Sequence, residues 1–395
     1  MTEEPIVIVG AARTPMGGFQ GLLSPLTAPQ LGAAAVSAAL GRSNIAGADV
    51  DEVIMGCVLP AGLGQAPARQ AALGAGIPQS VGCTTLNKVC GSGMKAVMLA
   101  HDLIRLGNNR IMVAGGMESM TNAPYLLPKG RVGYRLGHGR VIDHMFLDGL
   151  EDAYDNGRLM GTYAEQCADR YGFTRAAQDA FAIRSLTRAR QAIEDGTFSA
   201  EISPLTLSSR SGDTTVEHDE QPGRANIERI PELKPAFREG GTVTAANSSS
   251  ISDGAAALVI TTASEAARRG VTPLATILAH ATHAQEPAWF TTAPVQAIRR
   301  LLERLHWSVQ DVGLFEINEA FAVVTMAAMH DLDLPADRVN VHGGACALGH
   351  PIGASGARII VTLLNALRRH GLDRGVAALC IGGGEATAIA VERRV

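Results

Sequence analysis

The hydrophobic positions of this chain follow two alternating periods. Apolar side chains recur at helical spacing in residues 92–106 and 355–370, namely at Val97, Ala100 and Ile104 and at Ile360, Leu363, Leu364 and Leu367. Short, continuous apolar runs follow at residues 111–114 and 376–380. Such runs are typical of strands buried on both faces, and helices between them are typical of crossovers between parallel strands. The pattern predicts an α/β fold in which the glycine after each helix, Gly107 or Gly371, has a left-handed backbone.

The same order of signals appears twice, about 265 residues apart. A helix-like run and a short apolar run follow both Ala28 and Ala293, and residues 92–118 then match residues 355–385. Every α/β protein alternates helices and strands, but the matched order of four signals favours a duplication. We therefore expect an N-terminal half at residues 1–120 plus 245–270, a loop insertion at 121–244, and a C-terminal half at 271–395.

The insertion has three parts with different patterns. Residues 119–157 are rich in Gly, Pro and Arg, which is typical of exposed loops or a subunit contact. Residues 163–193 have a helical pattern with Thr174 as an N-cap, and the polar residues 208–224 predict a surface loop. An insertion of this size usually forms a lid or a binding region.

Composition narrows the class of protein. A chain of 395 residues with 46% hydrophobic residues can bury a large core. The net charge of −4, without a basic block, gives no indication of nucleic-acid binding. Residues 1–5 are acidic and too short for a signal peptide, and no apolar run is long enough for a membrane span. The six cysteines match neither a zinc site nor a Cys-x-x-Cys pair, so we expect free thiols, no metal and a cytoplasmic location.

Cys90 is the first candidate for chemistry. It directly precedes a predicted helix that starts with Gly91, Ser92 and Gly93. The helix dipole and free N–H groups would lower the pKa of a thiol there, which suits a nucleophile, and the glycines let an acyl group approach the backbone. A single cysteine in an apolar run is more often core than nucleophile, so the interpretation depends on other groups nearby.

Three further residues lie in frames that suit acyl chemistry. Cys380 ends an apolar strand before three glycines, at the carboxyl edge where α/β folds bind ligands, so a second thiol would lie near the first. His350 lies between Gly349 and Pro351, which would hold its imidazole at a helix entrance, where it could generate the thiolate. Asn318 follows an apolar strand and offers an amide donor, although it could equally cap the next helix.

Together these segments resemble the thiolase family, specifically its acetyl-CoA acetyltransferase group. The resemblance covers the whole chain and includes residues 87–94, 115–120, 241–249, 318–321, 343–358 and 380–384. It implies two duplicated α/β halves that form a five-layered α/β/α/β/α core, with a loop domain inserted between them. It also implies a homotetramer, a dimer of dimers, that associates through residues 119–143.

The resemblance implies residue roles as well. Cys90 would accept the acyl group, with His350 as its base, and Cys380 would exchange a proton with the α-carbon of the second substrate. Asn318, through a water, and His350 would hold one thioester oxygen, and the N–H groups of Cys90 and Gly382 would hold the other. The coenzyme A channel would be lined by Leu150, Met160, Arg224, Phe237, Ala245, Ser249, Ala320 and Phe321. Two residues depart from the short-chain pattern: Leu159 replaces a usual histidine, and Phe290, near the acyl pocket, replaces a usual methionine.

The expected reaction is the reversible condensation of two acetyl-CoA to acetoacetyl-CoA and CoA through an acyl-cysteine, with no cofactor beyond the CoA thioesters. One alternative is a degradative 3-ketoacyl-CoA thiolase of broader chain length. A decarboxylating condensing enzyme is disfavoured because the second cysteine, Cys380, is present. An inactive acyl-CoA-binding or scaffold protein is the alternative from another class.

Overall fold

The computed structural model describes residues 4–210 and 212–393, so the predicted outer limits at residues 1 and 395 lie outside it. The strands are β1 (Ile6–Arg13), β2 (Gly17–Gly18), β3 (Glu52–Gly56), β4 (Gly82–Leu86), β5 (Ile111–Ser119), β6 (Tyr125–Leu126), β7 (Ile142–Asp143), β8 (Leu205–Ser209), β9 (Gly212–Val216), β10 (Ser252–Thr262), β11 (Ala275–Ala284), β12 (Leu314–Ile317), β13 (Arg374–Ile381) and β14 (Glu385–Glu392).

The helices lie mainly between these strands. They are α1 (Ala28–Ser43), α2 (Pro67–Gly74), α3 (Ser92–Arg105), α4 (Met160–Tyr171), α5 (Arg175–Glu194), α6 (Glu220–Arg224), α7 (Ala263–Arg269), α8 (Ala293–Leu305), α9 (Ala322–Leu332), α10 (Ala345–Leu348) and α11 (Ile352–His370). Short helical turns include η2 (Phe146–Leu150), η4 (Ile227–Glu232) and η5 (Pro287–Thr292).

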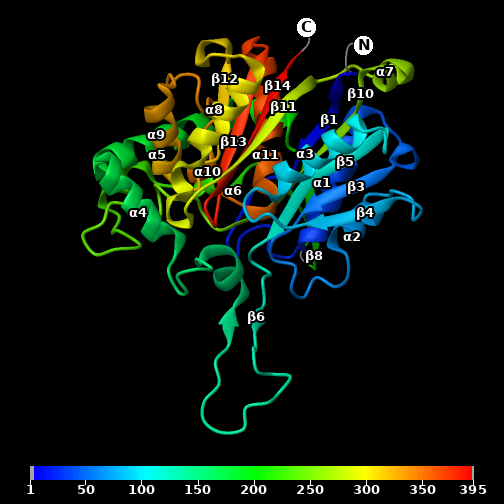
Figure 1. The fold of residues 1–395 in the computed structure, drawn as a ribbon. Coiled ribbons are helices and arrows are strands. Elements are labelled where there is room, and N and C mark those ends of the chain that lie inside the picture. The colour runs from blue at the N-terminus through cyan, green and yellow to red at the C-terminus, as the bar shows by residue number, and fades with distance from the viewer. Residues whose placement is uncertain (1–3, 211, 394–395) are drawn as a thin grey trace.

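The two halves carry the same sheet. The strand order is β1-β10-β5-β3-β4 in the N-terminal half and β11-β14-β13-β12 in the C-terminal half (Figure 1). In each half the first three strands are antiparallel neighbours and the fourth pairs in parallel. The predicted duplication is therefore confirmed, although the sheet is mixed where the apolar runs predicted parallel strands. Pairing of β1 with β11 joins the two sheets.

The core explains why the strands are apolar on both faces. In β1, Ile6 and Ile8 belong to a central hydrophobic cluster, while Val7 and Val9 belong to an outer one. Side chains of α3 and α11 fill the central cluster between the two sheets, and α1 and α8 cover the outer faces. Successive residues of a strand point to opposite faces, so both faces are buried and apolar. This is the predicted α/β/α/β/α arrangement.

The central helices α3 and α11 meet at a pair of glycines. A Cβ on Gly93 would lie 2.8 Å from the backbone nitrogen of Ala357, and one on Gly356 would lie 2.4 Å from that of Met94. Any side chain at either position would force the helices apart. These glycines therefore hold together the two helix entrances, which carry Cys90 and His350.

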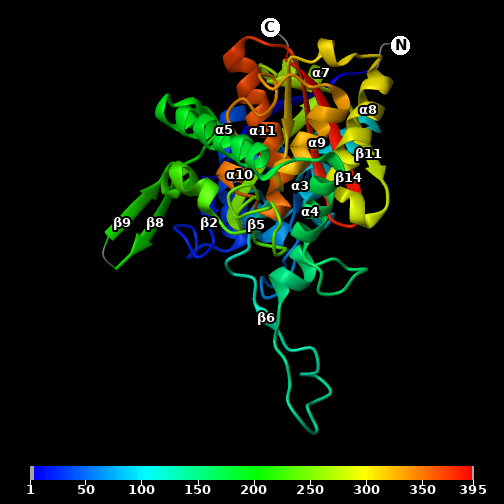
Figure 2. The same cartoon turned by 90° about the vertical axis from the view of Figure 1, so that its left-hand side faces the viewer.

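The insertion is partly as predicted. Residues 120–145 form an arm, with β6 at its base, that extends away from the body in both views (Figures 1 and 2). The predicted helices are α4 and α5, and the Thr174 side chain caps α5 by accepting from the Ala177 N–H at 3.1 Å. The prediction of a surface loop at residues 208–224 is wrong in part. Strands β8 and β9 pair as a hairpin there, and α6 buries Glu220 and Pro222.

No helix in the part of the chain that the structure describes is long and apolar enough to span a membrane.

Candidate active site

A mainly apolar cavity of about 370 Å³ lies where the insertion meets both halves. Its wall comes from η2, the start of α4, residues 236–251, η5, the segments just before α3 and α9, the start of α11 and the end of β13 with the loop after it. The predicted residues on this wall are Cys90, Leu150, Met160, Phe237, Ala245, Ser249, Phe290, Ala320, Phe321, His350, Cys380 and Gly382. Segments far apart in the chain thus converge on one space.

Cys90 lies just before α3, as predicted, and is partly exposed to the cavity. It follows Val89, whose φ of 47° is unusual for a β-branched residue and marks a tight turn. The Lys88 ammonium pairs with Glu385, which ties this turn to the loop after Cys380. The turn presents the Cys90 thiol to the cavity.

The prediction of a lowered thiol pKa is wrong. Burial raises the pKa of Cys90 to about 11, and the N–H groups of Gly382 and Cys90 offset only part of this rise. An apolar wall disfavours a thiolate more than these N–H groups favour it. The resting group is therefore a thiol that needs a base, and the N–H groups of Gly382 and Cys90 both lie near its sulfur.

His350 supplies a neutral imidazole at the start of α11, as predicted. Burial, together with the nearby Arg358 charge, lowers its pKa to about 3. Its Nδ1 lies 2.5 Å from the Ser355 hydroxyl, which in turn donates to the Pro351 carbonyl at 2.9 Å. Because the hydroxyl has only one proton, it must accept from Nδ1–H.

This arrangement leaves His350 Nε2 as the basic nitrogen. In residues 4–210 and 212–393, Nε2 is buried and has no hydrogen-bond partner. A neutral imidazole with a free lone pair can take the proton of a thiol.

Cys380 ends β13 and is almost completely buried on the same wall. Burial raises the pKa of its thiol well above the usual value, and the proximity of Cys90 raises it further. The two thiols are therefore close, as expected from the repeat, and both rest in the protonated state.

Asn318 lies behind the wall, completely buried, and its N–H donates to the Ala378 carbonyl at 3.0 Å. The helix-cap alternative is wrong, because α9 starts at Ala322 with Phe321 in the N-cap position. Its side-chain Nδ2 has no hydrogen-bond partner among the described residues. Asn318 thus retains a free donor close to Ala320 and Phe321 of the wall.

Arg224 is the predicted channel residue that is not among the described wall residues. It lies on α6, where its guanidinium pairs with Glu220 at 2.7 Å and its side chain is 59% exposed. The two residues that depart from the short-chain pattern, Leu159 and Phe290, do line the cavity. Phe290 is buried in edge contact with the rings of Tyr163 and Phe321, and Leu159 lies beside Met160.

Comparison with known proteins decides the family. The model of the thiolase N-terminal domain matches residues 6–264, and that of the thiolase C-terminal domain matches residues 271–393. This chain belongs to the thiolase family.

Several thiolases resemble it over their whole length. "Acetyl-CoA acetyltransferase 2" of Arabidopsis thaliana is 51% identical, covering 98% of this chain and 96% of the relative. "Acetyl-CoA acetyltransferase" of Cupriavidus necator is 49% identical, covering 98% and 99%. The crystal structure of Acat5 thiolase from Ascaris suum in complex with coenzyme A superposes with a TM-score of 0.94 at 42% identity, covering 99% and 100%. The thiolase fold expected from the sequence is therefore confirmed.

The structure also shows residues around this thiolase site whose contacts sequence reasoning missed. Glu118 at the end of β5 is completely buried and accepts N–H donors from Val58 (2.9 Å), Leu59 (3.1 Å) and Gly353 (2.9 Å). Burial raises its pKa to about 7. Glu118 thereby ties the N-terminal half to the start of α11. The sequence did contain signals for these contacts. Glu118 lies at the end of a glycine-rich apolar run, and Ser355 follows His350 by five residues.

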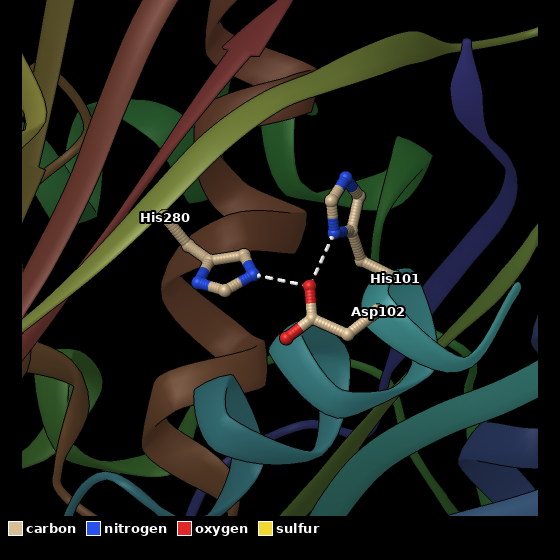
Figure 3. A group of neighbouring side chains, drawn as sticks. All are labelled: His101, Asp102 and His280. Atoms are coloured by element: carbon tan, nitrogen blue, oxygen red, sulfur yellow. Dashed lines mark hydrogen bonds and ion pairs between the residues drawn. The ribbon is translucent and has the colours of Figure 1, made fainter. Parts of the chain in front are cut away.

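A group of possible metal ligands lies outside the described cavity wall. His101 Nδ1 on α3 and His280 Nε2 on β11 both lie 2.9 Å from the same oxygen of Asp102 (Figure 3). These three side chains are the only such group among the described residues. Their hydrogen bonds to one carboxylate connect α3 of one half with β11 of the other.

Proposed function

We propose that this chain is an acetyl-CoA C-acetyltransferase that condenses two acetyl-CoA reversibly to acetoacetyl-CoA and CoA. The observation that carries the proposal is the convergence of Cys90, His350 and Cys380 on one apolar cavity. Relatives of 46–51% identity that carry this name support the acetyl specificity. The complex of a structural neighbour with coenzyme A supports a CoA thioester as the ligand.

The first half-reaction acylates Cys90. Nε2 of His350 takes the thiol proton, and the sulfur attacks the thioester carbon of acetyl-CoA. The N–H groups of Cys90 and Gly382 stabilise the charge on the acyl oxygen. The intermediate collapses to acetyl-Cys90, and the departing CoA thiolate takes the proton of Cys380. Cys380 is then a thiolate beside a protonated His350.

The second half-reaction forms the carbon–carbon bond. The Cys380 thiolate removes a proton from the α-carbon of the second acetyl-CoA, while Asn318, through a water, and His350 hold the thioester oxygen as the enolate develops. The enolate attacks the acetyl carbon and expels Cys90, which recovers its proton from His350. Acetoacetyl-CoA and one CoA result, and the enzyme returns to its starting protonation state. The reaction needs no cofactor beyond its CoA substrates.

A degradative 3-ketoacyl-CoA thiolase would use the same residues on longer chains. Thiolysis rates across 3-ketoacyl-CoAs of about 4 to 16 carbons distinguish the two functions, because only the acetyl enzyme should be fastest on acetoacetyl-CoA. No turnover of any chain length would favour an acyl-CoA-binding or scaffold protein.

Phe290 supports the short-chain function, because its buried ring lies on the cavity wall in edge contact with Phe321 and takes up space there. Overlap with such a ring costs a ligand roughly 1–3 kcal/mol, or about 5- to 160-fold in kcat/KM. Phe290→Met should raise kcat/KM for six- and eight-carbon substrates relative to acetoacetyl-CoA. A wild-type enzyme already faster on eight carbons than on four would refute both the pocket argument and the acetyl assignment.

The proposal includes a homotetramer in the cytoplasm. The arm exposes the apolar side chains Leu127, Val132, Leu136 and Val141, of which Leu136 is 97% exposed. Exposed apolar groups of this kind mark association sites. Light scattering during size exclusion should give four copies of the 41.2 kDa chain, and deletion of the arm tip should give two.

A further inference from the structure

Asn318 has an amide whose orientation decides whether it stabilises or repels an oxyanion. Its Oδ1 accepts from Nη2 of Arg358 at 3.4 Å, and its Nδ2 is left without a hydrogen-bond partner in the described chain. The opposite orientation would direct Oδ1, a negative dipole end, to the position that Nδ2 now occupies.

Arg358 can enforce this choice because it has only donors. It lies on α11 with an exposed fraction of 1%, and its Nη1 is held by Glu316 Oε1 at 3.1 Å. A guanidinium fixed in this way can donate a hydrogen bond to Oδ1. In the opposite amide orientation, the Nδ2 donor would face the guanidinium donors and no hydrogen bond could form. The chain Glu316–Arg358–Asn318 therefore leaves Nδ2 as the free group.

Two buried polar side-chain atoms near Arg358, Asn318 Nδ2 and His350 Nε2, have no hydrogen-bond partner among the described residues. Buried polar groups are almost always hydrogen-bonded, so two free ones together indicate groups reserved for a ligand. Arg358 lies close enough to influence both residues.

We infer that Arg358 is a positioning residue, which fixes the Asn318 amide so that Nδ2–H faces the cavity and holds the thioester oxygen of the second acetyl-CoA through a water. This inference rests on the proposed acetyltransferase function. It predicts that Arg358 acts on the condensation step and much less on the acetylation of Cys90, whose acyl oxygen is held by backbone N–H groups.

The experiment compares Arg358→Met, Asn318→Ala and the double variant with wild type. Mass spectrometry after rapid quenching gives the rate of Cys90 acetylation by acetyl-CoA, and steady-state assays give condensation. We expect Arg358→Met to lower condensation at least about tenfold more than acetylation, as loss of a hydrogen bond to a charged group would do. The double variant should be no more than about twofold slower in condensation than Asn318→Ala, because one residue acts through the other.

Arg42→Met is the matched control. Among the described residues, Arg42 donates only to the carbonyls of Ala11, Glu201 and Ile202, away from the cavity wall, so its loss should leave the ratio of condensation to acetylation unchanged. If Arg358→Met does not fold because Glu316 loses its partner, Glu316→Gln combined with Arg358→Met removes the unpaired charge and takes its place.

Two results would overturn the inference. In one, Arg358→Met slows acetylation and condensation equally. In the other, the double variant loses the product of the two single effects. Both differ from failure of the proposed function, in which the wild-type enzyme itself makes no acetoacetyl-CoA.

Discussion

Ser92 and Ser355 occupy matching positions in the two halves, each followed by the glycine at which α3 and α11 meet. The Ser92 hydroxyl donates to the Val89 carbonyl at 2.7 Å and accepts from the Lys88 N–H at 2.8 Å. The Ser355 hydroxyl also donates to a backbone carbonyl but accepts from the His350 imidazole. One serine therefore fixes the backbone before the thiol, and the other fixes the tautomer of the base.

This difference shows how a duplicated scaffold acquires unequal halves. The strand order, helix entrances and glycine contact are shared, because packing requires them in both halves. The chemical groups are not shared: the entrance of α3 carries Cys90, and that of α11 carries His350. Nucleophile and base thus come from different halves, and both line the same cavity because the two helix entrances lie together.

The largest effect should come from the nucleophile of the N-terminal half. Cys90→Ser should abolish acetylation by acetyl-CoA, because a serine hydroxyl holds its proton far more tightly than a thiol and a neutral His350 cannot take it. Mass spectrometry after incubation with acetyl-CoA measures the adduct. The matched variant is Cys380→Ala, which should still be acetylated at Cys90. An adduct present in Cys90→Ser and lost in Cys380→Ala would reverse the roles of the two thiols.

The second effect should come from the thiol of the C-terminal half. Cys380→Ala should form acetyl-Cys90 but lose at least about 10²-fold in condensation, which is typical for removal of a general acid or base. Rapid-quench assays of the two half-reactions separate these steps. Undiminished condensation would show that another group removes the α-proton.

The serine pair tests the comparison itself. Ser355→Ala should slow acetylation of Cys90 by about fivefold, since the tautomer of His350 loses a hydrogen bond of roughly 1 kcal/mol and its neutral ring can present either nitrogen. Ser92→Ala should mainly lower stability, because it removes two bonds from a turn with an unfavourable Val89 backbone. Thermal unfolding and single-turnover acetylation measure both variants. Equal slowing of Cys90 acetylation by the two variants would mean that the two serines have the same role.

Much of this could be predicted from the sequence. The apolar runs predicted the strands, because a strand buried on both faces has few polar positions, and matched signals in residues 28–56 and 293–318 predicted the duplication. The glycine frames of Cys90, His350 and Cys380 located these residues correctly at helix entrances and a strand end.

Other features could not be predicted because they depend on contacts between distant segments. The pKa of Cys90 depends on an apolar wall assembled from the insertion and both halves, so the local helix start gave the wrong direction. The orientation of Asn318 depends on Arg358, 40 residues away. The polar run at residues 208–224 has surface composition, yet Glu220 is buried because it accepts from the N–H groups of Gly18 and Leu22.

The smallest predicted effect concerns a second neutral imidazole of the C-terminal half. His342 is buried against the rings of Phe198 and His370, and burial lowers its pKa to about 4. The unfolded chain, with an ordinary histidine pKa near 6.5, binds the proton more readily between these values. Stability from His342 is therefore complete above about pH 6.5 and is lost as the pH falls toward 4.

His342→Gln should reduce this loss. Within the window, the free energy of unfolding of the wild type should fall up to about 1.4 kcal/mol per pH unit more steeply than that of the variant. Urea unfolding at several pH values from 7 to 4.5 measures the two slopes, and comparison of slopes cancels the constant cost of the lost ring contacts. His218→Gln, a change at an exposed histidine, should leave the slope unchanged. If His342→Gln also kept the wild-type slope, the acid sensitivity would lie in other groups, of which His350 is the next to test because its pKa is lowered in the same direction.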